Sequence, residues 1–330
     1  MSEALTVASL VPAGSLTTVG AAPLAVGVAL PDRVVSTEEV AAGAGVDPEW
    51  MLSRTGIRER RHARPDERLS DLATAAGRQA LERAGVSPAD LDLVLVGTVA
   101  ADEITPNAAP LVAHALGATR AGAWDVGAAC SAFLAALSTG TAAIESGRAE
   151  HVLVIGVDFL SRWTDWKDRA TAALFSDGAG AIVLGATEGT DRVGPVLLRA
   201  DGAHAEKLIG RREEGVLRMD GPEVFKHAVA RMGEVLLEAV AQAGCQPDDI
   251  DLWVLHQANA RILRAVATKL DLSPDRVVES IATLGNNSAA TLPLALDAAR
   301  ADGRLQTGST VALAAFGAGF TWGGAVLRWG

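Results

Sequence analysis

The chain has 330 residues and a formal net charge of −11; 49% of its residues are apolar and 21% are charged. This composition is typical of a globular protein with a large core, and the length predicts about two domains of ordinary size. The negative net charge argues against nonspecific binding of nucleic acid. No stretch is apolar and long enough to span a bilayer, and the only two cysteines, Cys130 and Cys245, indicate neither a disulfide framework nor a metal site.

The start of the chain predicts no targeting segment. Residues 1–16 hold no Lys or Arg, and Pro12 and Gly14 interrupt the apolar residues, so we expect a loose extension and no signal peptide. A protein with two unpaired cysteines fits a reducing cytoplasm best. We then expect a strand over 17–30 and a helix that begins at 36–39, where two glutamates favour a helix N-terminus.

A helix-strand unit occurs twice in the chain. A helix over 71–84 ends at Gly85 and precedes a buried strand over 91–96, and the string at 84–93 returns in similar form at 243–252, an offset of 159 residues. The repeat predicts an α/β protein of two duplicated halves, 17–187 and 193–330. Strands alternating with helices predict layered sheets, rich in parallel pairs, that are covered by helices and carry chemistry at strand ends.

Three residues occupy such strand ends. Cys130 lies in the segment 125–134, before a small-residue helix that runs to about Gly147, where the helix dipole favours a thiolate. Asn286 occupies the matching corner of the second half, and His256 ends the strand over 252–255. Each has a simpler interpretation: a small core residue for Cys130, a capping residue for His256 and a turn residue for Asn286. Cys245 has no such setting and is expected to be inert.

A series of strings in a fixed order joins these residues into one pattern. From about Thr17 onward the chain resembles the thiolase superfamily and, within it, β-ketoacyl-acyl-carrier-protein synthase III. The matching strings are Trp50 with 54–58, the Cys130 segment, 176–181, 219–226, 256–259, 285–290 and 316–323.

The resemblance implies a thiolase fold and assigns roles to the three residues. Cys130 is expected to carry the acyl group, and His256 and Asn286 to hold the thioester carbonyl of a malonyl group while carbon dioxide leaves. The backbone amides of Cys130 and Ala318 are expected to form the oxyanion hole, although the family often has Gly where Ala318 stands. Neither a metal nor a cofactor is expected, because the acyl-CoA is a substrate.

The resemblance also implies sites for three partners. Coenzyme A is expected to bind at Trp50, Arg54, Arg162, Phe225 and Asn259. An acidic acyl carrier protein is expected at the basic residues of one helix, although each charge alone equally indicates a solvated surface; these residues are Arg261, Arg264 and Lys269. A homodimer is expected. In it, the loop around Thr105 would reach across a twofold interface.

The acyl pocket is expected to include Thr105 and Phe133. Some relatives have a Phe where Thr105 stands, so a wider or longer pocket is expected here. Trp163 and Trp166 have no counterparts in the resemblance, and the sequence favours neither an acyl entrance nor simple surface packing for them.

The resulting hypothesis is a decarboxylative condensing enzyme for fatty-acid initiation or polyketide priming. The alternative is an acyltransferase of the same fold that acylates an oxygen or nitrogen acceptor. Asn286 favours the first, because simple acyl transfer needs no decarboxylating amide. The presence of Cys130 argues against a noncatalytic subunit, and the absence of Cys from 316–322 argues against a degradative thiolase.

Overall fold

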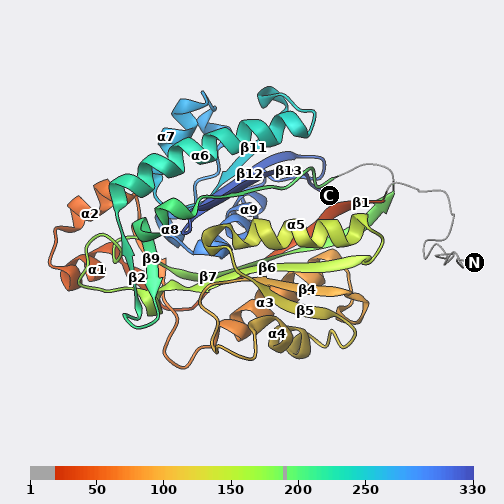
Figure 1. Ribbon diagram of the computed structural model, residues 1–330, viewed down its shortest axis with the longest axis horizontal. Helices are drawn as coiled ribbons and strands as arrows, with labels where there is room; N and C mark the ends of the chain where they lie inside the picture. The colour runs from red at the N-terminus through yellow and green to blue at the C-terminus, as the bar shows by residue number, and fades with distance from the viewer. Residues whose placement is uncertain (1–18, 189–191) are drawn as a thin grey trace, which may run out of the picture.

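The computed structural model describes residues 19–188 and 192–330, so the predicted extension over 1–16 lies outside the described residues. Two sheets and three layers of helices alternate through the molecule (Figure 1). The helices α5 (Ala132–Glu145) and α9 (Thr291–Ala301) lie between the two sheets and contact both. Most of the buried side chains of α5 and α9 pack into one core with strands from both sheets.

The first sheet has five strands in the order β1-β7-β6-β4-β5. Its strands β6, β4 and β5 pair in parallel, whereas β7 runs antiparallel to both β1 and β6. The predicted strands over 17–30 and 91–96 belong to it as β1 and β4. The bounds are β1 (Val19–Ala29), β4 (Leu93–Gly97), β5 (Gly122–Val126), β6 (His151–Phe159) and β7 (Asp177–Glu188).

The second sheet has the order β11-β12-β13-β8, in which only β11 and β12 are parallel. Its bounds are β8 (Leu197–Ala200), β11 (Leu252–Leu255), β12 (Thr310–Gly317) and β13 (Thr321–Arg328). The sheets are thus mixed, not rich in parallel pairs, because each half adds an antiparallel strand, β7 or β13, after its parallel unit.

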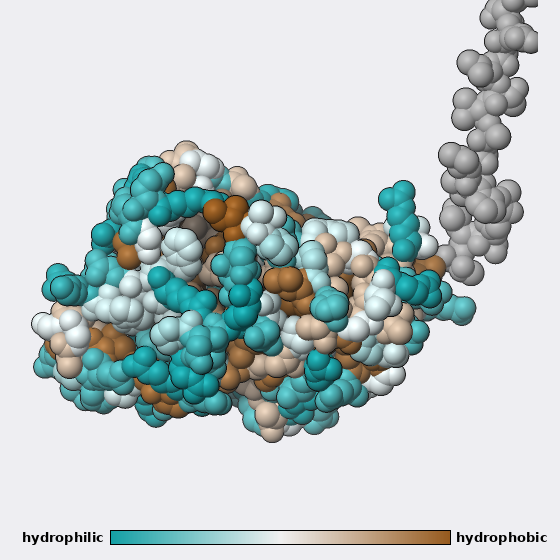
Figure 2. Space-filling model, turned by 90° about the horizontal axis from the view of Figure 1, so that it is seen from below, coloured by the Kyte–Doolittle hydropathy of each residue, from teal (hydrophilic) through white to brown (hydrophobic). Residues whose placement is uncertain are grey.

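Helices cover the outer faces of both sheets. The helices α3 (Leu69–Ala84) and α4 (Ala108–Leu116) pack on the first sheet, while α6 (Gly221–Gln242) packs on the second and α7 (Ala260–Lys269) packs on α6. On the face that lies below in Figure 1, hydrophilic side chains interrupt the hydrophobic ones (Figure 2). No helix within 19–188 or 192–330 has both the length and the apolar character needed to cross a membrane.

Short elements complete the fold near one end of the molecule. Two small antiparallel sheets pair β2 (Val34–Ser36) with β3 (Glu59–Arg61) and β9 (Leu208–Arg211) with β10 (Val216–Met219). Three short helices are α1 (Thr37–Ala44), α2 (Pro48–Thr55) and α8 (Ile281–Leu284). Ser36 caps α1 as predicted, since its side chain accepts a hydrogen bond from the Glu39 amide.

The repeat of 159 residues is visible in backbone detail. Gly85 and Gly244 both have a positive φ, at 66° and 70°. Asp92 and Asp251 each accept a hydrogen bond from the first residue of a strand: Asp92 from the amide of His151 at 3.1 Å and Asp251 from that of Thr310 at 2.8 Å. The two halves therefore use the same turns and side-chain contacts, while the exact division of the chain at 187 and 193 stays a prediction.

Candidate active site

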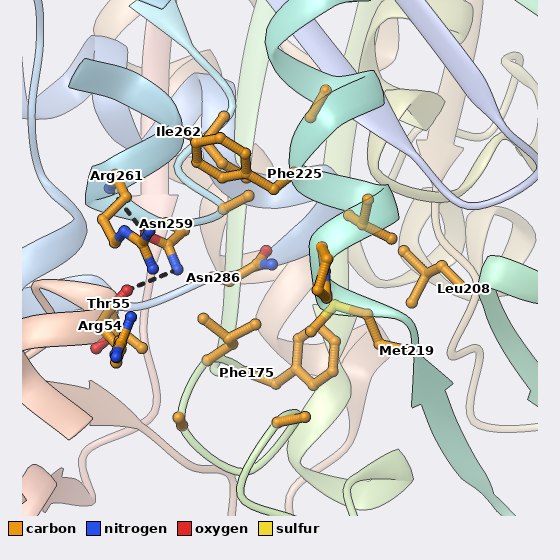
Figure 3. A pocket seen from close by; sticks show the side chains of 18 of the residues that line it. Arg54, Thr55, Phe175, Leu208, Met219, Phe225, Asn259, Arg261, Ile262 and Asn286 are labelled. Atoms are coloured by element: carbon orange, nitrogen blue, oxygen red, sulfur yellow. Dashed lines mark hydrogen bonds between the residues drawn. The ribbon is translucent and has the colours of Figure 1, made fainter. Parts of the chain in front are cut away.

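A cavity of about 710 Å³ lies among α2, α6, α7 and the ends of β11 and β12. Arginine and amide side chains lie at one side of it and apolar side chains at the other, with Asn286 between them (Figure 3). The residues that line it and were predicted to act in the site are Trp50, Arg54, Cys130, Phe225, His256, Asn259, Arg261 and Asn286. Residues distant in the sequence therefore converge on one cavity.

Cys130 lies in a single turn, Ala129–Ser131, directly before α5. The backbone of Gly317 at the end of β12 approaches it so closely that a Cβ on Gly317 would lie 2.7 Å from the Cys130 backbone nitrogen. Only glycine fits at such an approach. Ala318 follows Gly317, so the two amides predicted for the oxyanion hole belong to neighbouring backbone segments.

Burial acts against ionisation of the Cys130 thiol. Burial raises the pKa of the Cys130 thiol to about 12, and the side chain is only 8% exposed. Desolvation of the charged sulfur opposes the effect predicted for the helix N-terminus, so the thiolate at this helix start stays a prediction. The thiol must lose its proton during the reaction itself.

Asn286 is held by the backbone on both sides. Its amide donates to the carbonyl of Leu174 at 3.0 Å, and its own carbonyl accepts from the Ser176 amide at 2.9 Å. Its side-chain oxygen accepts a hydrogen bond from the Ser288 backbone nitrogen at 3.0 Å. The side-chain oxygen is thus engaged within the protein, which leaves the side-chain NH₂ group as a donor toward the cavity.

His256 follows β11 directly, and its backbone nitrogen donates to the carbonyl of Ala314 at 2.8 Å. Its side chain is buried, and burial lowers the pKa of the imidazole to about 3. The ring is therefore neutral near pH 7, and in a neutral imidazole one nitrogen carries a hydrogen that it can donate. Its Nδ1 is buried and has no hydrogen-bond partner among the described residues.

The His256 imidazole and the Asn286 amide are neutral donors, so they are better suited to bind a thioester carbonyl than an anion. A neutral imidazole and a side-chain amide, both lining the cavity of the thiol, can stabilise charge that develops on a carbonyl oxygen without first binding an anionic ground state. Cys130 carries the only thiol among the lining residues, so acyl transfer through a thioester is the chemistry that this arrangement supports.

The rim of the cavity carries the remaining predicted polar residues. The Asn259 side chain caps α7, accepts from the Arg261 amide at 2.8 Å and donates to the carbonyl of Arg54 at 3.1 Å (Figure 3). The Arg261 guanidinium lies 5.6 Å from the centre of the Phe225 ring. These contacts connect α2, α6 and α7 at the rim of the cavity.

Arg162 lies apart from the other residues predicted to bind coenzyme A. Its guanidinium donates to the carbonyls of Arg64 and Glu67 and lies 3.6 Å from Asp102, outside the residues that line the cavity. Arg169, which the sequence analysis missed, lines the cavity and lies 5.6 Å from the centre of the Trp50 ring. The irregular segment between β6 and β7 has no periodicity that predicts which arginine faces the cavity.

Phe133 and Thr105 also lie outside the cavity of this chain. Phe133 is fully buried on α5 in the core between the sheets, because it occupies an inward position of that helix. Thr105 is exposed on the loop between β4 and α4. A role for Phe133 in the acyl pocket stays a prediction that its place in the core does not support, and a role for Thr105 would require a second subunit.

Three further predicted or noted groups lie at the surface or in side clusters. The basic residues Arg264 and Lys269 are exposed on α7, like Arg261, and Arg264 pairs with Glu279 at 3.3 Å. Trp163 packs against the core of the first half, and the Trp166 ring lies 4.6 Å from that of His62. Neither tryptophan lines the cavity, so the structure favours packing for both.

Comparisons with known proteins agree with this geometry. Two family models match: 3-oxoacyl-[acyl-carrier-protein (ACP)] synthase III over residues 124–202, and the C-terminal model of the same family over 240–329. A β-ketoacyl-[acyl-carrier-protein] synthase III from Rhizorhabdus wittichii is 47% identical over 310 residues, which cover 92% of this chain and 97% of the relative. One from Synechococcus elongatus is 45% identical over 329 residues, covering 94% of this chain and 98% of the relative.

Solved structures show the same fold. The 3-oxoacyl-[acyl-carrier-protein] synthase III of Aquifex aeolicus has a TM-score of 0.90 and 39% identity, and the match covers 94% of this chain and all of that one. The priming β-ketosynthase from the R1128 polyketide biosynthetic pathway has a TM-score of 0.91 and 37% identity, with 94% and 96% of the chains covered. The chain belongs to the 3-oxoacyl-[acyl-carrier-protein] synthase III family, and the predicted α/β thiolase fold is confirmed.

Proposed function

We propose that the protein joins the acyl group of an acyl-CoA to malonyl-acyl carrier protein by a decarboxylative Claisen condensation. The observation that carries the proposal is the convergence of Cys130, His256 and Asn286 on one cavity. Enzymes named β-ketoacyl-[acyl-carrier-protein] synthase III are similar in sequence to this chain over most of its length. Fatty-acid initiation and polyketide priming both begin with this chemistry, and the similar proteins include β-ketoacyl-[acyl-carrier-protein] synthase III enzymes and a priming β-ketosynthase of a polyketide pathway.

The reaction has two stages. In the first, the Cys130 sulfur attacks the acyl-CoA carbonyl, the amides of Cys130 and Ala318 hold the oxyanion, and the CoA sulfur leaves. In the second, malonyl-carrier protein loses carbon dioxide, and His256 and Asn286 stabilise the enolate by donating hydrogen bonds to its oxygen. The enolate carbon then attacks the Cys130 thioester, which forms the carbon–carbon bond and releases the sulfur.

Intact-protein mass spectrometry with a panel of acyl-CoAs tests this proposal. Acetyl-, isobutyryl-, hexanoyl- and octanoyl-CoA are each mixed with the protein. We expect at least one of them to add one acyl mass per chain and to release one CoA. A protein that gained no acyl mass from any of the four would contradict the proposal.

A simple acyltransferase is the second candidate. It would also load Cys130 but would pass the acyl group intact to an oxygen or nitrogen acceptor. The amide of Asn286, with its oxygen held by Ser288 and its nitrogen free to donate, favours decarboxylation because acyl transfer has no enolate to stabilise.

The rim of the cavity is the proposed coenzyme A site. Trp50 and Arg169 provide an aromatic face and a planar cation for the adenine and phosphates, Arg54 adds a second cation, and Phe225 and Asn259 border the path inward. We further propose that the exposed residues Arg261, Arg264 and Lys269 dock an acidic acyl carrier protein.

Replacing Arg169 by Ala is expected to raise the KM for acyl-CoA about tenfold, a loss of about 1.4 kcal/mol, because a stacking and phosphate-binding cation is lost. Arg162→Ala is the matched control, since Arg162 belongs to the same segment but binds Asp102 instead. The KM for acyl-CoA of each variant, measured by steady-state kinetics, shows which of the two arginines binds coenzyme A. A larger KM for Arg162→Ala than for Arg169→Ala would restore the sequence-based assignment.

A homodimer is proposed from the edge of the first sheet. Within 19–188 and 192–330, no strand pairs with the outer side of β5, and its Trp124 is 40% exposed. Beside it, Val99 and Ile104 on the loop of Thr105 are 49% and 82% exposed. Exposed apolar side chains beside an unpaired edge strand favour pairing with a second copy. We also place the protein in the cytoplasm, since both of its cysteines are free thiols.

In such a dimer, Thr105→Phe is expected to shift acyl-CoA preference toward acetyl-CoA. The larger side chain would occupy the partner's acyl pocket, and each excluded methylene forfeits about 0.8 kcal/mol of apolar burial, so the preference changes tenfold or more for a few carbons. Thr105→Ser is the control. An unchanged chain-length profile in a folded dimeric Thr105→Phe variant would remove Thr105 from the pocket.

A further inference from the structure

A buried carboxylate lies behind the active-site cysteine, and the reaction described above does not use it. Asp158, near the end of β6, is fully buried. One of its oxygens accepts from the Thr98 hydroxyl at 2.9 Å and the Val99 amide at 2.8 Å, and the other from the Ala289 amide at 3.2 Å. A carboxylate that is wholly surrounded by donors is held as an acceptor, although its burial is costly.

Ser288 connects this carboxylate to the nucleophile. Its hydroxyl lies 3.4 Å from the Cys130 sulfur, the amide of the next residue, Ala289, donates to Asp158 at 3.2 Å, and the Ser288 hydroxyl lowers the pKa of Asp158. Ser288 has a φ of +50°, in the left-handed region that residues other than glycine rarely occupy. Ala129, the residue before Cys130, has a φ of +48° and stands 159 residues earlier. The strained corners of the two halves thus meet at the sulfur.

We propose that Ser288 and Asp158 form a proton relay that takes the Cys130 proton when the acyl group is loaded and returns it when the acyl group leaves. The inference rests on the proposed function, because it requires an acyl-cysteine intermediate. It adds the path of the proton, which the thiol must lose and which has no other hydrogen-bonded route among the described contacts of the Cys130 sulfur.

The charges around the thiol favour this path over transfer to His256. The Ser288 hydroxyl lies 3.4 Å from the Cys130 sulfur, whereas His256 makes no hydrogen bond to that sulfur among the described contacts. Burial lowers the pKa of His256 and raises the pKa of Asp158, which agrees with this path. The hydrogen bond from Ser288 lowers the Cys130 pKa, and the charge of Asp158 raises it. Among the described residues, Asp158 is the only charge that acts on the Cys130 pKa.

The proton balance is complete over one turnover. On loading, the S–H proton passes to Ser288 while the Ser288 proton passes to Asp158; the new C–S bond forms, and the CoA thiolate leaves and takes a proton from water. On condensation, the C–S bond breaks and the Cys130 thiolate receives the proton back from Asp158 through Ser288. One bulk proton is consumed in each turnover, and it is consumed during loading.

Stopped-flow measurement with a pH indicator tests the relay in the unmodified protein. At pH 7 we expect about one proton to be taken up per acyl-enzyme formed, because a released CoA thiol with an ordinary pKa of about 8.5 is protonated there. The acyl-CoA used is the one from the panel that loads fastest, and Cys130→Ala supplies the signal from binding alone. Formation of the acyl-enzyme with no net proton uptake would overturn the relay.

Two variants test the individual groups. Ser288→Ala is expected to slow acyl loading by about a hundredfold or more, as expected when proton transfer is lost. Ser131→Ala is the matched control: it removes an equally buried hydroxyl that is adjacent to Cys130 but bonds to the Thr321 carbonyl at 3.2 Å. Loading by Ser131→Ala is expected to stay within about threefold of the unmodified rate.

The pH dependence of alkylation by iodoacetamide distinguishes a relay from simple packing. In a Cys245→Ser background, Ser288→Ala is expected to raise the Cys130 pKa, because a donor to the thiolate is lost, whereas Asp158→Asn is expected to lower it, because a negative charge is lost. Asp158→Asn should also load slowly despite its lower thiol pKa. Faster loading by Asp158→Asn, or equal pKa shifts in the two variants, would contradict the relay.

These outcomes separate the relay from the proposed function. If no acyl-CoA of the panel acylates Cys130, the proposed function fails. If the acyl-enzyme forms without proton uptake, only the relay fails. Should Asp158→Asn not fold, the proton count of the unmodified protein and the loading rate of Ser288→Ala still decide the matter.

Discussion

Replacing Cys130 by Ala will remove the acyl-enzyme and reduce condensation by at least about a thousandfold, because no other thiol lines the cavity. The Ala side chain fits the space that the Cys130 side chain occupies between α5 and Gly317, so the fold should be unaffected. Intact-protein mass spectrometry after mixing with acyl-CoA measures the loss directly.

Cys245→Ser is the matched control for this prediction. Cys245 is half-buried in the turn after α6, and its sulfur contacts only the Ala243 carbonyl, at 3.7 Å, among the described hydrogen bonds. This variant should gain the full acyl mass. An acyl mass that survives in Cys130→Ala and disappears in Cys245→Ser would show that the nucleophile has been misassigned.

The second large effect is expected to separate the two half-reactions. Asn286→Ala should still load the acyl group but release carbon dioxide from malonyl-carrier protein about 10²- to 10³-fold more slowly, because one of two donors to the enolate oxygen is lost. Single-turnover mass spectrometry gives the loading rate, and trapping of labelled carbon dioxide gives the decarboxylation rate.

Asn287→Ala provides the comparison. The Asn287 amide donates to the Ser176 hydroxyl at 3.1 Å and to the Asp177 carbonyl at 3.0 Å, so it supports the same segment without lining the cavity. Its loss should lower the free energy of unfolding by about 1–3 kcal/mol but keep the ratio of the two half-reactions. An equal loss of both half-reactions in Asn286→Ala would assign Asn286 a structural role.

The sequence could predict the convergence of the three central residues because it follows from the repeat. Cys130 and Asn286 stand at corresponding strand-to-helix corners, and His256 ends a strand of the second half, so any fold that stacks the two halves brings these corners together. A thiol, an imidazole and a side-chain amide at these corners favour acyl transfer through a thioester. The resemblance of the matching strings indicated the family, and the comparisons confirm it.

The positions of the side chains outside regular elements could not be predicted in this way. Arg162 and Arg169 belong to one irregular segment, where neither a period of two nor of 3.6 indicates which side chain faces the cavity. Phe133 lies on a helix that is covered by sheets on both sides, so its inward position leads to the core and not to the substrate. Both outcomes depend on contacts between distant segments.

The pKa of the Cys130 thiol is a second property that the sequence alone could not predict. The sequence places Cys130 at a helix start, which by itself lowers a thiol pKa. The structure adds the close approach of Gly317 and the carboxylate of Asp158, and burial then dominates. Burial of this kind is set by β12 and β6, which lie far from Cys130 in the chain, so no local pattern predicts it.

The central claim is the formation of a carbon–carbon bond with loss of carbon dioxide. The most direct test supplies the protein with malonyl-acyl carrier protein and the acyl-CoA that loads fastest, and measures the mass of the carrier protein together with the carbon dioxide released. The account predicts a β-ketoacyl-carrier protein, with one carbon dioxide and one CoA released for each product molecule. An acyl group transferred intact to the carrier protein or another acceptor, with the malonyl carboxylate retained, would contradict it.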